Sequence, residues 1–203
     1  DWRESVGMTF RLYYTMNKLV RHINNHKDFF SILAILFFCL GFFVHLFFPS
    51  PKSFATAEIG ANDIWYFNFP MKNFLREQLV QNKLPLWNSY IGQGFPVLAE
   101  SQIGTFNLTN LILFRFLPTI YAFNISFILI FFQISLGTYL FCKSLNFKSV
   151  VSLLLSLTFA FSGFFITHIS HFSLLHAASF FPLIMFGTNL IAPAFLCPPP
   201  SAK

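Results

Sequence analysis

The sequence predicts an all-α integral membrane protein with about four transmembrane helices. Of its 203 residues, 55% are hydrophobic and only 10% are charged, whereas soluble domains usually carry about 25% charged residues. The mean hydropathy is +0.62, and 32 residues are Phe. Long apolar runs alternate with the segments that hold the charges, which is the pattern of helices that face lipid.

The first apolar run, 29–48, reads FFSILAILFFCLGFFVHLFF and has the length that a helix needs to cross the hydrocarbon core. A cleavable signal peptide is the competing interpretation, but its apolar core is shorter and ends at a small-residue cleavage site. The preceding segment, 1–28, is basic and suits either an interfacial helix or a solvated cytoplasmic lead-in. The chain starts at Asp1 and its tail, 193–203, ends in CPPPSAK, so we expect an N-terminal fragment of a longer protein.

The segment 49–117 is predicted to be an extracytoplasmic loop with interfacial helices. Pro49 stops the first span. Residues 68–82 mix apolar with polar side chains, Lys72 and Arg76 among the polar ones, as expected of a helix lying at the membrane interface. Trp and Tyr are the residue types found at headgroup level, and a second short interfacial segment is expected at 102–115.

Three further spans follow, with short connections. We expect spans at 118–141, 149–167 and 173–192, a cytoplasmic hinge at 142–148 and an outer turn at 168–172. The hinge carries Lys143 and Lys148 and no acid, so the positive-inside rule places the hinge and the N-terminus in the cytoplasm. The net charge is +6, and the positively charged residues flank the spans and do not form a stripe. Nucleic acid is therefore not an expected partner. The expected partner is the lipid bilayer.

Asp63 is the strongest catalytic candidate, because it follows the first span closely and lies in a loop that must return to the membrane interface. Partial desolvation at a membrane boundary favours a carboxylate as a general base. The alternative is structural, since Asn62 or Asp63 suits the N-cap of the following helix. Two other acids of this loop, Glu58 and Glu100, lie outside the predicted helix.

Three histidines, His168, His171 and His176, lie at the outer end of the third span and the start of the fourth. They are suited to gripping a phosphate or a sugar, or they are simply interfacial side chains. Their spacing does not match the pair of helical zinc ligands at i and i+4, and no metal ligand set is predicted. No cofactor is expected, and the need for a divalent metal stays open.

Two stretches resemble a known family. The first match consists of Asp63, of positions in LPLWNSYIGQGFPVLAESQIGTF, and of Asn107 directly after that stretch; the positions within it are Leu84, Pro85, Leu86, Trp87, Asn88, Tyr90, Gly94, Pro96, Ala99 and Gln102. The second match, in FSGFFITHISHFSLLHAASFFPLIMFG, consists of Ser162, Gly163, His171, Ala178, Pro182 and Leu183. The pattern resembles the YfhO-type bacterial membrane proteins, which are related to the GT-C class of glycosyltransferases. Ser89 stands where the family usually has Pro, Asn82-Lys83 where a Gly is common, and Asn107-Leu108 where it has Tyr-Pro.

The resemblance implies a multi-pass enzyme of the bacterial inner (cytoplasmic) membrane, with a GT-C-like N-terminal part. It would transfer a sugar from a polyprenyl-phosphate donor to a cell-envelope acceptor on the outer face, with Asp63 as the base. The substrate-binding residues that it implies are Glu58, Arg76, Trp87, Asn88, Tyr90, Gln102, His168 and His171. The alternative is a non-catalytic polytopic membrane protein, a lipid-linked precursor transporter or a scaffold, in which Asn124 and Gln133 would matter more.

Overall fold

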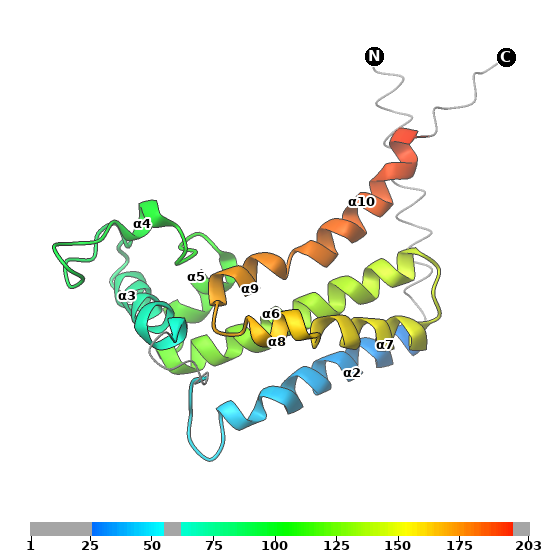
Figure 1. Ribbon diagram of the computed structural model, residues 1–203, viewed down its shortest axis with the longest axis horizontal. Coiled ribbons are helices and arrows are strands. Elements are labelled where there is room, and N and C mark those ends of the chain that lie inside the picture. Colours follow the sequence, from blue (N-terminus) through cyan, green and yellow to red (C-terminus); the bar gives the residue numbers. More distant parts are fainter. Residues whose placement is uncertain (1–25, 55–61, 197–203) are drawn as a thin grey trace. The chain divides into compact units, whose positions relative to one another are not determined.

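The computed structural model describes residues 26–54 and 62–196, so the predicted role of Glu58 and most of the predicted segment 1–28 lie outside the described residues. The protein is mostly helical, at 71%, and the described residues contain no strand (Figure 1). They divide into two compact units. The first contains 26–38, 132–162 and 179–196, and the second contains 39–54, 62–131 and 163–178.

Within residues 26–54 and 62–196, four helical segments are long and apolar enough to cross a membrane, in agreement with the predicted number. Their bounds are His26–Leu46, Thr119–Ser144, Ser149–Thr167 and Phe172–Ile191. The first consists of α2 (His26–Phe43) and a short 3-10 turn, η1 (Val44–Leu46), and the second is α6 (Thr119–Ser144). The third consists of α7 (Ser149–Ala160) and α8 (Gly163–Thr167), and the last begins with α9 (Phe172–Ala178) and continues into α10 (Phe181–Leu196).

The last helical segment is broken, whereas the sequence predicts one uninterrupted span at 173–192. α9 ends at Ala178 and α10 begins at Phe181, and Pro182 is the second residue of α10. A proline lacks the amide N–H and its ring collides with the carbonyl four residues earlier, so it fits the first turn of a new helix. In the first unit Gly137 of α6 lets α10 approach closely: a Cβ there would lie 3.1 Å from the backbone nitrogen of Leu183.

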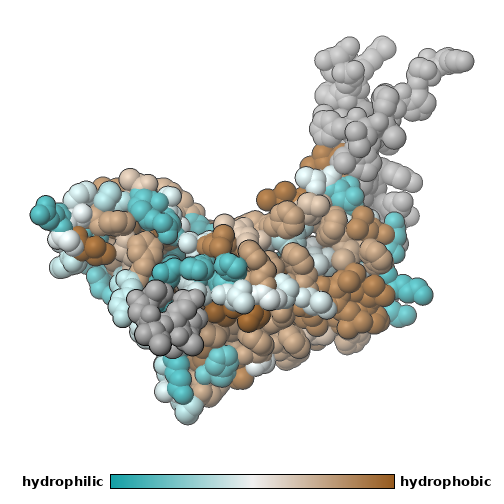
Figure 2. All heavy atoms as spheres, viewed as in Figure 1, coloured by the Kyte–Doolittle hydropathy of each residue, from teal (hydrophilic) through white to brown (hydrophobic). Residues whose placement is uncertain are grey.

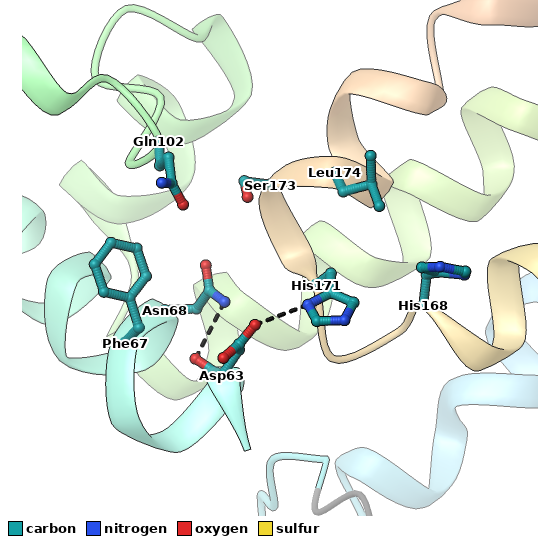
Figure 3. Close-up of a pocket in the computed structure, with 8 residues that line it drawn as sticks. All are labelled: Asp63, Phe67, Asn68, Gln102, His168, His171, Ser173 and Leu174. Atoms are coloured by element: carbon teal, nitrogen blue, oxygen red, sulfur yellow. Dashed lines mark hydrogen bonds and ion pairs between the residues drawn. The ribbon is translucent and has the colours of Figure 1, made fainter. Parts of the chain in front are cut away.

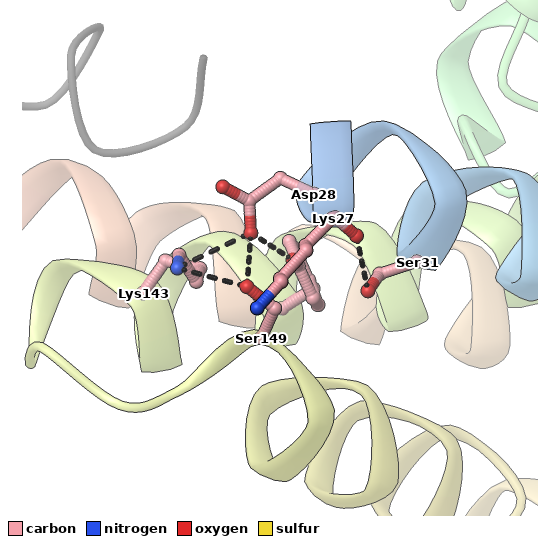
Figure 4. Close-up of polar contacts among 6 residues, drawn as sticks. Lys27, Asp28, Ser31, Lys143 and Ser149 are labelled. Carbon is pink, nitrogen blue, oxygen red and sulfur yellow. Dashed lines mark hydrogen bonds and ion pairs between the residues drawn. The ribbon is translucent and has the colours of Figure 1, made fainter. Parts of the chain in front are cut away.

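A buried polar cluster holds three helices of the first unit together (Figure 4). Asp28 of α2 is fully buried. Its Oδ1 atom accepts hydrogen bonds of 2.6 Å from the hydroxyls of Tyr139 and Ser149. Lys143 Nζ lies 3.2 Å from the same oxygen, and the lysine is only 6% exposed. The cluster therefore joins the start of α2 to the end of α6 and the start of α7.

Two polar side chains of α6 form hydrogen bonds with other segments of the chain. Asn124 donates to the carbonyls of Leu46 (3.0 Å) and Lys52 (2.8 Å), which ties the turn after η1 to α6 in the second unit. This explains why the first span ends at Leu46, two residues before the predicted end. Gln133 donates to the Ser179 hydroxyl at 3.0 Å in the first unit.

The second unit contains the helices of the predicted loop and a cluster of buried aromatic side chains. A wide π-helical turn, η2 (Ile64–Asn68), runs directly into α3 (Phe69–Val80). α4 (Val97–Glu100) and α5 (Leu108–Phe116) follow, and α5 packs against α3. Phe123, Phe127 and Phe172 are fully buried or nearly so, with the rings of Phe123 and Phe172 stacked at 4.8 Å. Stacking of this kind stabilises the fold beyond the area that it buries.

Large hydrophobic side chains remain exposed along the helices, as Figure 2 shows over α7 and the start of α2. Phe37 and Phe38 of α2 are 63% and 47% exposed, and Leu154 of α7 is 61% exposed. Soluble monomers rarely leave contiguous apolar surface of this kind in water. The surface is compatible with contact to a lipid bilayer.

Candidate functional site

The N-terminal cap of the helical segment that carries Asp63 comes from its neighbour. Asn62 Oδ1 accepts a 3.0 Å hydrogen bond from the backbone N–H of Ile64, and the Asp63 side chain makes no capping hydrogen bond. Of the two caps that the sequence allowed, the structure uses Asn62. The Asp63 carboxylate is left to face another part of the second unit.

That partner is His171, in the turn before α9. Its Nδ1 atom lies 2.7 Å from Asp63 Oδ2, with the two side chains 45% and 49% exposed. Because a carboxylate only accepts hydrogen bonds, Nδ1 carries the proton, and Nε2 of a neutral His171 is an acceptor. A carboxylate that fixes the tautomer of an imidazole is the arrangement by which proteins prepare a histidine for proton transfer.

Asp63 and His171 lie in the wall of a pocket with a volume of about 360 Å³ (Figure 3). The side chains of Asn68, Gln102 and Ser173 point into it from three different segments. Asn68 is nearly buried and donates from Nδ2 to the backbone carbonyl of Asp63 at 3.1 Å, which holds the start of the π-helical turn. The residues that line the pocket are Asp63, Phe67, Asn68, Gln102, His168, His171, Ser173 and Leu174.

His168 is the second imidazole of the pocket. Its Nδ1 atom lies 2.8 Å from the carbonyl of Phe164, and its ring packs on the Phe164 ring at 4.6 Å between centroids. The carbonyl fixes the proton on Nδ1, so Nε2 of a neutral His168 is again the acceptor atom. The rings of His168 and His171 lie 5.8 Å apart. Both histidines therefore have a fixed orientation.

Lys72 does not line this pocket, but it contacts the chain next to two of the lining residues. It is 2% exposed, although the sequence pattern placed it on the polar face of its helix. Its Nζ donates to the carbonyl of Ile103 at 2.6 Å and lies 5.3 and 5.1 Å from the ring centroids of Phe114 and Phe172. Ile103 directly follows the pocket residue Gln102, and Phe172 directly follows His171. Through Lys72, both of these chain segments are in contact with α3.

Burial lowers the pKa of the Lys72 amine to about 7. The two rings and the carbonyl favour the protonated amine, but the loss of water around the charge is the larger effect. Among the described residues Lys72 forms no ion pair that would offset this loss.

We expect the unfolding free energy of the protein to rise between about pH 7 and about pH 10, because there the unfolded chain keeps a proton that folded Lys72 has lost. Lys72→Met should remove this rise, which is on the order of a few kcal/mol. Equilibrium unfolding in detergent at several pH values measures it, with exposed Lys83→Met as the control. Equal slopes in wild type and Lys72→Met would contradict the assignment.

The structure brings four of the predicted site residues together and leaves four elsewhere. Asp63, Gln102, His168 and His171 line the pocket, but Arg76, Trp87, Asn88 and Tyr90 do not. Arg76 Nε donates to the carbonyl of Leu117 at 2.9 Å. Asn88 is buried, and its Oδ1 atom accepts from the backbone N–H of Tyr90 at 2.9 Å.

Trp87 and Tyr90 are 56% and 87% exposed in the loop that precedes α4. This loop is closed by the bridge between Asn88 and Phe95. A Cβ atom at Gly94, whose φ is +111°, would overlap the Trp87 indole, so only glycine fits there. The LPLWN motif thus shapes a turn in this structure.

Sequence reasoning missed Phe67, Asn68, Ser173 and Leu174 as pocket residues. Asn68 and Ser173 are each close in sequence to a predicted site residue, but nothing local indicates which way their side chains point. Among the described residues no group of three or more His, Cys, Asp or Glu side chains could hold a metal ion. The prediction of a site without metal ligands stays a prediction.

Comparison with protein-family models, with curated proteins and with solved structures finds no match for this chain.

Proposed function

We propose that this chain is part of an integral membrane glycosyltransferase of GT-C type, which transfers a sugar from a polyprenyl-phosphate donor to a cell-envelope acceptor. The observation that supports this most is the hydrogen-bonded pair of Asp63 and His171 in the wall of a polar pocket. The resemblance to YfhO-type proteins points to the same reaction and to the bacterial inner membrane. The four apolar helices support a membrane protein.

The pocket belongs to segments that adjoin one end of the candidate spans. His168 follows directly on the span that ends at Thr167, and Asp63 lies in the segment between Leu46 and Thr119, where one span ends and the next begins. The positive-inside rule assigns this end to the outer face, because Lys143 and Lys148 lie at the other. A donor with a lipid tail would then reach the pocket from the membrane.

The proposed reaction is an inverting displacement at the anomeric carbon. The acceptor hydroxyl oxygen bonds to that carbon, the bond from the carbon to the phosphate oxygen breaks, and the phosphate leaves with the electron pair. The hydroxyl proton passes to Nε2 of His171, while Asp63 holds the proton on Nδ1 and stabilises the imidazolium that forms. The resemblance made Asp63 the base, whereas its hydrogen bond to His171 favours a shared role.

A transfer assay with the full-length protein in membranes tests the proposal. A radiolabelled polyprenyl-phosphate sugar is supplied, and incorporation into envelope material is compared between wild type and Asp63→Asn at matched expression. Loss of incorporation in the variant is the expected result. Full incorporation by Asp63→Asn, or none by the wild-type protein, would contradict the proposal and favour the transporter or the scaffold.

A further inference from the structure

The pocket, as far as the structure describes its lining, has no permanently charged cation for a phosphate group, and its two imidazoles already use Nδ1 for the Phe164 carbonyl and for Asp63. Asp63 is its one acid, and among the described residues no Lys or Arg lines it. Lys72 is turned to Ile103 and Arg76 to Leu117, and the Arg115 guanidinium donates to the carbonyl of Leu79 and to Asn82. Proteins normally hold phosphates with arginine or lysine side chains. A phosphate inside this pocket would instead meet the Asp63 carboxylate.

The polar groups that do line the pocket suit hydroxyl groups. The amides of Asn68 and Gln102 each offer a donor and an acceptor, and the Ser173 hydroxyl can act as either. Figure 3 shows all three directed into the space next to the pair of Asp63 and His171. Phe67 adds an apolar wall. Few oriented polar groups with an aromatic surface are typical of sites for small polar ligands.

We propose that this pocket binds the acceptor as a neutral polyol or sugar, with the donor's phosphate at its edge and not inside it. Gln102 is the specificity-determining residue, because its side chain reaches into the pocket and it is more exposed than Asn68. The acceptor hydroxyl that faces Nε2 of His171 is the one that reacts. This inference rests on the proposed function and adds the chemical class of the ligand.

Binding without turnover tests the inference. The full-length protein in lipid nanodiscs is mixed with glycerol, ribitol or N-acetylglucosamine, and saturation-transfer NMR records contact with each probe. We expect at least one probe to bind, and Gln102→Leu to weaken it about fivefold, as the loss of one net hydrogen bond implies. The matched control is Gln81→Leu, at an exposed glutamine that does not line the pocket, and it should bind as the wild type does.

Inorganic phosphate serves as the competitor. The inference predicts that phosphate leaves the probe signal unchanged. Displacement of the probe by phosphate, or binding by none of the three probes, would overturn it even if the transfer assay succeeds. Probe binding that depends on Gln102 in a protein without transfer would keep the ligand class and reject the proposed function.

Discussion

His171→Gln is expected to lower sugar transfer by about 10²–10⁴-fold, the usual contribution of a positioned acid or base. Glutamine keeps a hydrogen-bond donor for Asp63 but has no basic nitrogen in the place of Nε2. Asp63→Asn should cause a loss of similar size, because an amide that donates to Nδ1 selects the tautomer with its proton on Nε2. The two losses should not add, since both residues act on one proton.

The relative size of these losses identifies the base. If Asp63 takes the acceptor proton directly, His171→Gln leaves the base in place and costs much less than Asp63→Asn. That result would return the role to Asp63. The control is His45→Gln, at an exposed histidine whose ring contacts the Phe42 carbonyl and not the pocket, and its transfer rate should match the wild type.

Asp28→Ala is expected to destabilise the protein by about 3–5 kcal/mol, the usual cost of removing one partner of a buried ion pair. The substitution leaves the Lys143 ammonium buried without its counter-ion and removes the acceptor that Tyr139 and Ser149 share. Asp28→Ala combined with Lys143→Met should recover most of the loss, because no uncompensated charge remains. Equilibrium unfolding of the purified protein in detergent gives the free energies.

Tyr139→Phe is the control for this cluster. It removes one hydrogen bond and leaves the ion pair in place, so about 1 kcal/mol is expected. An Asp28→Ala variant that loses no more than Tyr139→Phe would show that the pair of Asp28 and Lys143 contributes little to the stability of the helices.

The four apolar helices could be predicted from the sequence because each signal is local. The bounds shifted where partners distant in sequence intervene, as Asn124 does at Leu46. The break before α10 has a local cause in Pro182, but the prediction of a single span passed over it. Helix number follows from composition, whereas helix ends depend on tertiary contacts.

The candidate site was predictable only in part. Asp63 and His171 were each selected, but they are 108 positions apart and no sequence pattern joins them. Lys72 was assigned to a polar face because lysine is rarely buried, yet the carbonyl of Ile103 and two rings cover it. Trp87 and Tyr90 were predicted to bind substrate because they belong to the motif, but they are exposed and do not line the pocket.

The π-helical turn from Ile64 to Asn68 sets the rotational phase of Asp63 relative to α3. A π-helical turn holds about one residue more than an α-helical turn, and each residue of an α-helix turns the chain by about 100°. Lys72 fixes α3 through Ile103. Deletion of one residue at 65 or 66, which do not line the pocket, would therefore rotate the Asp63 carboxylate away from His171 and leave the lining residues unchanged. The number of residues in this π-helical turn therefore determines whether the Asp63 carboxylate reaches the His171 imidazole.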